Sequence, residues 1–185
     1  MELDERDDDE LMLLARAGAE GAFAVLVRRH ENLALRFAAR KLHVSTQLVG
    51  DVVQNAFLNV YLALSQYEAR GQFRAFLFRI LINQCRMAGR AARVETRWRS
   101  HSTADHVPVA APGQEEELLL RERRRDVEEA VARLSSKLRD VVLLRWSGEL
   151  SYDEIAVTLR IPIGTVKRRL FTAIKKLQRF MGVRR

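Results

Sequence analysis

Residues 160–185 form a strongly basic segment, with nine Lys and Arg side chains and no Asp or Glu. Six of its side chains recur at the spacing of one helix face: Lys167, Arg168, Phe171, Thr172, Lys175 and Arg179. An Arg side chain can bond O6 and N7 of one guanine, while Phe and the Thr methyl group can contact thymine methyls. The pattern therefore favours contact with the bases and phosphates of DNA, with a solvated amphipathic helix as the alternative.

The residues around the start of this face have the pattern of a helix-turn-helix. Ser151 and Glu154 fit a capping box, in which each side chain satisfies a free backbone N–H at the start of a short helix. Pro162 suits the first turn of a second helix, where its missing N–H is no loss. Buried positions are expected in both helices and at the turn: Ile155, Ala156, Leu159, Ile161, Val166, Leu170, Ala173, Ile174 and Leu177. The second helix of such a motif enters the major groove, which would bring the basic face to the base edges.

A second basic stretch lies in the middle of the chain. Between residues 86 and 99 it holds a set of arginines against Glu95 alone: Arg86, Arg90, Arg93, Arg97 and Arg99. The whole chain carries a formal charge of +8, and acidic residues concentrate in the first ten positions and in residues 115–129. Charge divided into blocks makes local positive surfaces, which favours a polyanionic partner.

Apolar spacing predicts helices through most of the chain. The first half holds a short helix near residues 10–17 and longer ones over 23–38, 49–64 and from 73 past 81. These helices can share one core, and Phe73, Phe76 and Ile80 are expected in it.

The periodicity fails in residues 96–114, which are small, polar and interrupted by proline, and it resumes beyond residue 127. We therefore expect an all-α fold of two small helical domains. The N-terminal helical bundle is expected at residues 1–95, a flexible linker at 96–118 and the C-terminal helix-turn-helix domain at 119–185. Trp146 is expected in the core of the second domain.

Several classes of protein are disfavoured. A single cysteine, Cys85, excludes an internal disulfide framework and is expected to be a packed, inert thiol. No apolar run approaches the ~20 residues that a membrane span needs, so we expect a cytoplasmic protein without membrane insertion. His101 and His106 lie in the expected linker and supply too few ligands for zinc. We expect no metal, no cofactor and no enzymatic activity, since neither a phosphate-binding glycine loop nor a nucleophile–base pair is evident.

Specific runs in both halves resemble the extracytoplasmic-function sigma factors of the sigma-70 family. In the C-terminal half these are Leu134-Ser-Ser-Lys-Leu-Arg-Asp-Val-Val-Leu-Leu-Arg145, Leu150-Ser-Tyr-Asp-Glu-Ile-Ala156, Gly164-Thr-Val-Lys167 and Arg169-Leu170. In the N-terminal half they are Gly50-Asp-Val-Val-Gln-Asn-Ala-Phe57, Phe73-Arg-Ala-Phe-Leu-Phe-Arg-Ile80 and Asn83. Response-regulator output domains share pieces of the first set and lack the second. The resemblance implies a sigma2-like and a sigma4-like domain in that order.

The resemblance implies roles for the N-terminal residues. Residues that would dock on the β′ clamp helices of core RNA polymerase are Asp51, Gln54, Asn55 and Phe57. Asn55 departs from the acidic residue usual in the family, although an amide can still hydrogen-bond. Residues that would handle the −10 strand are Arg70, Gly71, Phe78, Arg79, Asn83, Arg86 and Arg90. An apolar wall and a few polar groups suit a flipped base, and the arginines suit its phosphates.

The resemblance also implies −35 contacts by Thr165, Lys167, Arg168, Arg169, Phe171, Thr172 and Lys175. Arg168 replaces the Ser of many relatives, so the preferred −35 sequence does not carry over. Further implied partners are the β flap of the polymerase and an anti-sigma factor. The function expected is promoter-specific transcription initiation, and an autonomous helix-turn-helix repressor or activator is the alternative. Only the alternative would bind duplex operator tightly without core polymerase.

Overall fold

The computed structural model describes residues 3–42, 46–98 and 125–182, and throughout these ranges the chain forms helices and no strand. The first half contains two 3-10 turns, η1 (Leu3–Glu5) and η2 (Leu64–Gln66), and four α-helices: α1 (Asp8–Arg16), α2 (Ala22–Leu42), α3 (Thr46–Leu62) and α4 (Phe73–Trp98). In the second half, residues 125–132 are helical and are followed by α6 (Ser136–Trp146), α7 (Tyr152–Leu159) and α8 (Ile163–Phe180). The all-α prediction is confirmed.

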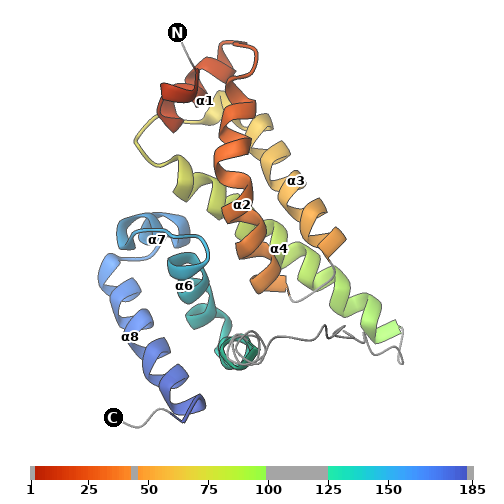
Figure 1. Cartoon of the computed structure of the whole chain (residues 1–185), viewed down its shortest axis with the longest axis vertical. Helices are drawn as coiled ribbons and strands as arrows, with labels where there is room; N and C mark the ends of the chain where they lie inside the picture. The colour runs from red at the N-terminus through yellow and green to blue at the C-terminus, as the bar shows by residue number, and fades with distance from the viewer. Residues whose placement is uncertain (1–2, 43–45, 99–124, 183–185) are drawn as a thin grey trace, which may run out of the picture.

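Helices α2, α3 and α4 pack side by side, and α1 crosses one end of α2 (Figure 1). Three phenylalanines lie at the centre of this bundle, because Phe37, Phe73 and Phe78 are each at most 2% exposed. The rings of Phe37 and Phe78 meet edge to face with centroids 5.4 Å apart. Burying a side chain of this size contributes roughly 1.5–3 kcal/mol, so each of the three rings favours the folded bundle by an amount of this order.

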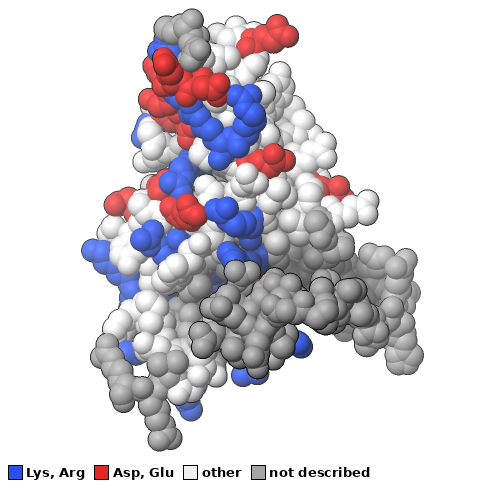
Figure 2. All heavy atoms as spheres, in the orientation of Figure 1, with Lys and Arg blue, Asp and Glu red and all other residues white. Residues whose placement is uncertain are grey.

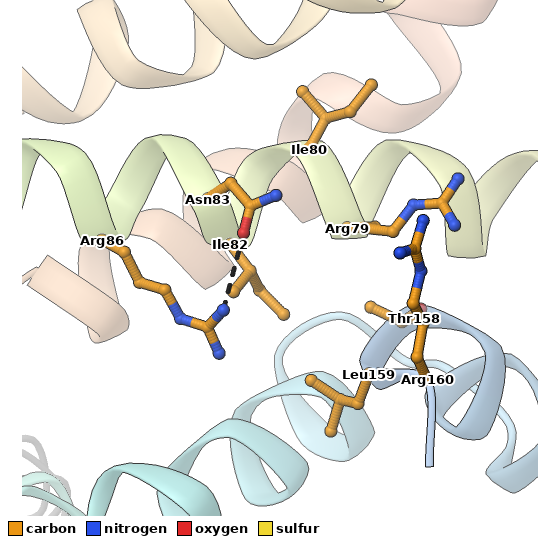
Figure 3. A pocket seen from close by; sticks show the side chains of 8 residues that line it. All are labelled: Arg79, Ile80, Ile82, Asn83, Arg86, Thr158, Leu159 and Arg160. Atoms are coloured by element: carbon orange, nitrogen blue, oxygen red, sulfur yellow. Dashed lines mark hydrogen bonds between the residues drawn. The ribbon is translucent and has the colours of Figure 1, made fainter.

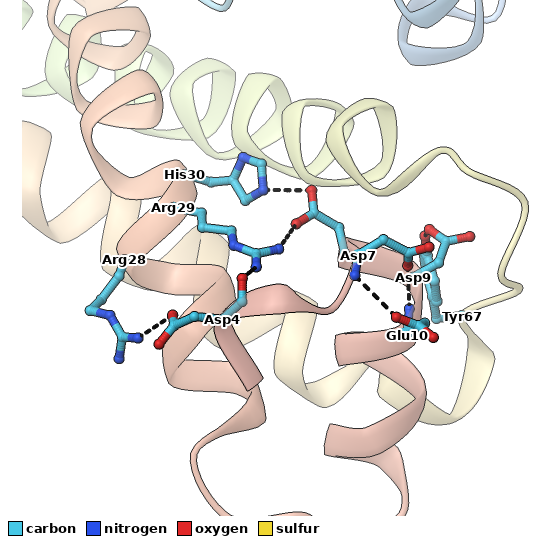
Figure 4. Close-up of polar contacts among 9 residues, drawn as sticks. Asp4, Asp7, Asp9, Glu10, Arg28, Arg29, His30 and Tyr67 are labelled. Carbon is cyan, nitrogen blue, oxygen red and sulfur yellow. Dashed lines mark hydrogen bonds and ion pairs between the residues drawn. The ribbon is translucent and has the colours of Figure 1, made fainter. Parts of the chain in front are cut away.

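A polar network fixes α1 to α2 (Figure 4). The carboxylate of Asp8 accepts a hydrogen bond from Arg29 at 3.0 Å and lies 2.7 Å from Nε2 of His30. Burial pushes the pKa of Asp8 upward, but the hydrogen bonds and charges of His30 and Arg29 outweigh it, so that pKa lies below its ordinary value. The acidic N-terminal residues therefore neutralise α2 cations, and Figure 2 shows acidic side chains gathered where α1 lies.

The C-terminal half packs against the N-terminal bundle, with α7 on α4 and α6 on α2. Arg74 of α4 donates hydrogen bonds to the backbone oxygens of Gly148 at 2.9 Å and Glu149 at 2.7 Å. Thr158 of α7 donates to the Ala75 oxygen at 3.3 Å. Buried apolar residues of both halves form one continuous cluster. The predicted domain boundaries remain predictions, because residues 99–124 lie outside the described ranges.

The burial of individual residues departs from the prediction at two helices. Trp146 is 54% exposed, so its expected place in a core is wrong. It is the last residue of α6, and more than half of its surface remains open at that helix end. Ile174 of α8 is 40% exposed and is also wrongly predicted, because α6 and α7 cover only the opposite side of α8. The buried state of Phe73 is confirmed, whereas Phe76 and Ile80 are half-buried at the edge of the core.

Candidate nucleic-acid interface

The helix-turn-helix is built by α7 and α8, and the capping box predicted at its start is confirmed. The backbone N–H of Glu154 donates to Oγ of Ser151 at 3.2 Å, and the N–H of Ser151 donates to the Glu154 carboxylate at 2.7 Å. Helix α7 ends at Leu159, and its C-cap residue Arg160 has a φ of 53°, which lies in the left-handed region. Pro162 is the N-cap of α8 and precedes its first turn. These local features set the angle at which α8 leaves α7.

One side of α8 is buried and the other is open. Val166, Leu170 and Ala173 are buried against α6 and α7. The predicted −35 residues lie on the remaining surface: Lys167, Arg168, Phe171 and Lys175 are exposed, and Thr165, Arg169 and Thr172 are partly exposed. The structure therefore brings the predicted −35 residues together on one face of a single helix.

The exposed face of α8 carries an aromatic ring between cations. Phe171 is 60% exposed, and Nζ of Lys175 lies 4.4 Å from its ring centroid. The hydroxyl of Thr172 donates to the Arg168 backbone oxygen at 2.9 Å, so this side chain lies close along the helix. An uncovered large apolar ring among cations suits a surface that contacts both base edges and phosphates.

The predicted −10 residues of α4 also share one face, at positions 79, 83, 86 and 90, but this face looks toward the C-terminal half. Arg79, Asn83 and Arg86 line a cavity together with Thr158, Leu159 and Arg160 at the end of α7 (Figure 3). Arg86 also binds Asp140 of α6 at 3.0 Å. Arg90 lies one turn further along α4 and is exposed.

Two residues that were predicted to contact a partner are buried, so neither side chain is available for that contact in this arrangement. Phe78 is fully buried between Phe37 and the Gly148 backbone, so it presents no face to a base. Phe57, predicted to contact polymerase, is 6% exposed and packs in the core instead. Both rings lie on the apolar face of their helices, and this face packs in the core.

The loop before α4 is held by α1. The Gly71 N–H donates to the Asp9 carboxylate at 2.6 Å, and the Tyr67 hydroxyl donates to the same side chain. Burial, and then the hydrogen bond and charge of Asp9, raise the pKa of Tyr67 above its ordinary value. Arg70 is exposed and pairs with Glu68. The predicted −10 residues Arg70 and Gly71 thus sit at an ordered turn some distance along the chain from Arg79.

Helix α3 presents a mixed polar and apolar surface. Its predicted polymerase-binding residues Asp51, Gln54 and Asn55 are exposed. Three large side chains that were not predicted for this surface also lie open on α3: Leu58, Tyr61 and Leu62 are 52%, 52% and 68% exposed. The helical periodicity of the sequence places these three residues outside the buried face of α3, and this pattern could have indicated their exposure. An uncovered apolar group beside polar residues is typical of a protein-binding surface.

Cys85 of α4 is buried, and burial raises the pKa of its thiol to about 12. Such a thiol is poorly ionised, which agrees with the predicted inert role. His101 and His106 lie outside the described residues. Among the helices that the structure does describe, none combines the length and apolar character needed to cross a bilayer.

Comparison with known proteins gives matches in both halves of the chain. The family described as Sigma-70 region 2 matches residues 26–94, and the family described as Sigma-70, region 4 matches residues 124–177. The ECF RNA polymerase sigma-E factor of Escherichia coli K12 is 30% identical over 173 residues, which is 90% of each chain. The RNA polymerase sigma factor CnrH of Cupriavidus metallidurans is 31% identical over 179 residues, covering 92% of this chain and 93% of that one.

A solved structure extends the likeness to three dimensions. The chain superposes on CnrH in its complex with the cytosolic domain of CnrY, with a TM-score of 0.69 and 29% identity, covering 96% of this chain and 99% of that one. With region 2 on α2–α4 and region 4 on the helix-turn-helix, the chain belongs to the extracytoplasmic-function sigma factors of the sigma-70 family.

Proposed function

We propose that this sigma factor binds core RNA polymerase through α3, reads the −35 element with α8 and contacts the −10 strand with α4. The observation that carries the proposal is the open face of α8 in a capped helix-turn-helix, where Lys167, Arg168 and Lys175 are exposed together with the ring of Phe171. The N-terminal residues of such a helix reach base edges, and cations further along neutralise phosphates. Recognition of this kind is binding and not catalysis, so no enzymatic step is assigned to the chain.

Contact with polymerase is supported by the surface of α3. Asp51, Gln54 and Asn55 offer polar groups, and the exposed Leu58 and Leu62 add apolar area next to them. Burial of apolar area with a few directed hydrogen bonds is the usual composition of a specific protein interface. The proposed site of action is the cytoplasm, where polymerase and chromosome meet.

Use of the −10 residues requires the two halves to separate. Arg79, Asn83 and Arg86 face the end of α7, and Phe78 packs against Gly148. A DNA strand that contacts these side chains needs the space that α7 occupies. We infer that the arrangement described here is the form before promoter binding, and that the C-terminal half moves when both promoter elements are engaged. Two weak contacts joined by a tether then reinforce each other.

An anti-sigma factor is the proposed regulator. The CnrH relative was solved in complex with the cytosolic domain of CnrY, and this chain shares its fold over almost its whole length. A protein that stabilises the packed form of the two halves would keep the −10 face of α4 from DNA. Capture of the full chain from its host is expected to recover polymerase subunits together with this inhibitor.

Transcription by purified components tests the proposed function. The chain added to core polymerase is expected to start transcripts from its promoters, while the chain alone binds duplex promoter DNA weakly. Tight operator binding by the chain alone, with no transcript in the presence of core enzyme, would instead identify an autonomous repressor or activator. Arg133→Ala is a suitable control variant, since Arg133 is exposed and lies outside all three proposed surfaces.

A further inference from the structure

A cavity of about 320 Å³ lies between the two halves of the chain (Figure 3). Helix α4 contributes Arg79, Asn83 and Arg86, and the end of α7 contributes Thr158, Leu159 and Arg160. Small-molecule sites in proteins begin at roughly 300 Å³, so the space suits a ligand larger than a single inorganic ion. Its lining includes three guanidinium groups and no carboxylate.

Two of these guanidinium groups face each other without an acid between them. Figure 3 shows the side chains of Arg79 and Arg160 directed toward one another. Within the described ranges neither pairs with an Asp or Glu, and the guanidinium carbon of Arg79 lies 5.5 Å from the ring centroid of Phe76. Burial first, and then the charge of Arg160, lowers the pKa of Arg79. Opposed cations of this kind are relieved by an anion that bridges them.

The left-handed backbone conformation of Arg160 gives a third, independent observation. Its φ of 53° places a non-glycine residue in the left-handed region, at the C-cap of α7 where glycine fits without strain. Glycine there would remove the strain together with the guanidinium group. A strained position that keeps a long cationic side chain aimed into a cavity points to a use for that charge.

From these observations we propose that the cavity binds a small phosphorylated anion, of the diphosphate or nucleoside diphosphate class. Guanidinium forks bind phosphate oxygens two at a time, so Arg79 and Arg160, which pair with no acid in the described ranges, match an anion with more than one phosphate group, while Arg86 is held by Asp140 beside them. Ile80, Ile82 and Leu159 supply an apolar part of the lining that can receive the rest of an organic phosphate. Because the ligand touches both α4 and α7, it stabilises the packed arrangement of the two halves.

Binding itself does not depend on the proposed function, but one consequence does. Arg79, Asn83 and Arg86 are also the proposed −10 contacts, so a bound phosphate compound and the −10 strand compete for the same side chains. A cellular anion would then favour the form of the chain that is not engaged with a promoter.

Calorimetry with the full purified chain tests the proposal, using pyrophosphate and adenosine diphosphate as probes. Both are expected to bind at one saturable site and to raise the melting temperature, whereas adenosine and potassium chloride of matched ionic strength are not. Arg160→Gln is expected to weaken binding about tenfold or more, since it removes charge-assisted hydrogen bonds. The control Arg133→Gln removes one exposed charge outside the cavity and is expected to bind like the unaltered chain.

Arg160→Gly separates ligand binding from folding. This variant is expected to lose binding as Arg160→Gln does while melting no lower than the unaltered chain, because glycine relieves the left-handed strain. Equal affinities of Arg160→Gln and Arg133→Gln, equal effects of chloride and pyrophosphate, or no binding of either probe would overturn the proposal. So would binding of a short single-stranded oligonucleotide with no binding of either small probe, which would assign the cavity to nucleic acid alone. None of these outcomes involves polymerase, so failure here leaves the proposed function to its own test.

Discussion

A guanidinium nitrogen of Arg86 on α4 lies 3.0 Å from the carboxylate of Asp140 on α6, although 54 residues separate them in the sequence. Lys41 of α2 pairs with the other oxygen of the same carboxylate. The Asp140 side chain is 4% exposed and the Lys41 side chain 10%. One buried acid of the C-terminal half therefore holds two cations of the N-terminal bundle, one of which is a proposed −10 contact.

The Asp140→Asn variant is expected to lose about 3 kcal/mol of unfolding free energy, the low end of the range for breaking a buried ion pair. Lys41 is left buried without its counter-charge, whereas Arg86 is half-exposed and can turn to water. Urea denaturation of the full chain measures the change. Asp153→Asn, at an exposed position of α7, serves as the control and is expected to lose less than about 1 kcal/mol. Similar losses in the two variants would contradict the assigned role of Asp140.

Gly148 lies where the two halves meet and has no room for a side chain. A Cβ added there would lie 2.8 Å from a ring carbon of Phe78 and 3.0 Å from the Leu144 oxygen. Gly148→Ala is therefore expected to destabilise the chain by about 1–3 kcal/mol through overpacking. Gly164→Ala meets no atom within 4 Å and is expected to cause no loss. Thermal unfolding of both variants checks the prediction, and an unchanged melting temperature for Gly148→Ala would show that the halves do not pack as described.

The network around Asp8 predicts a specific dependence of stability on pH. Since the pKa of Asp8 is lower in the folded chain than its ordinary value of 3.8, its stabilisation is complete above that value and is lost as pH falls through the folded pKa. The stability difference between the unaltered chain and Asp8→Asn is expected to be fully present at about pH 5 and to shrink below about pH 4. Urea denaturation at each pH gives this difference. A difference that stays constant down to about pH 2 would rule out the assigned ionised form.

The thiol of Cys85 is expected to resist alkylation in the folded chain. Raising its pKa from 9.0 to about 12 lowers the thiolate fraction about a thousandfold near neutral pH, and burial hinders access further. Mass spectrometry after timed iodoacetamide treatment, with and without urea, measures the protection. Rapid labelling in the absence of urea would show that α4 opens readily at Cys85.

The parts of the fold that depend on near neighbours in the sequence were predictable. The capping box of Ser151 and Glu154 and the buried positions Val166, Leu170 and Ala173 follow from spacing within one or two helical turns. The open basic face of α8 follows from the same spacing. Because both halves resemble the same family, one function could be predicted for the whole chain.

The parts that depend on packing between distant helices were not predictable. Nothing near Asp140 in the sequence indicates Lys41 or Arg86 as its partners, and periodicity alone does not tell whether Ile174 faces another helix or solvent. Phe57 and Phe78 were assigned contacts by resemblance, but the helix stripe that carries them is buried. The left-handed backbone of Arg160 likewise becomes visible only once α7 is seen to end there.

The proposed function depends above all on the reading of promoter sequence by α8 while the chain is bound to core polymerase. Its most direct test is transcription by polymerase reconstituted with the unaltered chain or with Arg168→Ala, on a set of promoters that differ only in the −35 element. Loss of a guanidinium that contacts a base edge is expected to reduce discrimination between −35 sequences by about 1–3 kcal/mol, with Arg133→Ala unchanged. Identical −35 preferences in Arg168→Ala and the unaltered chain would contradict this role of α8.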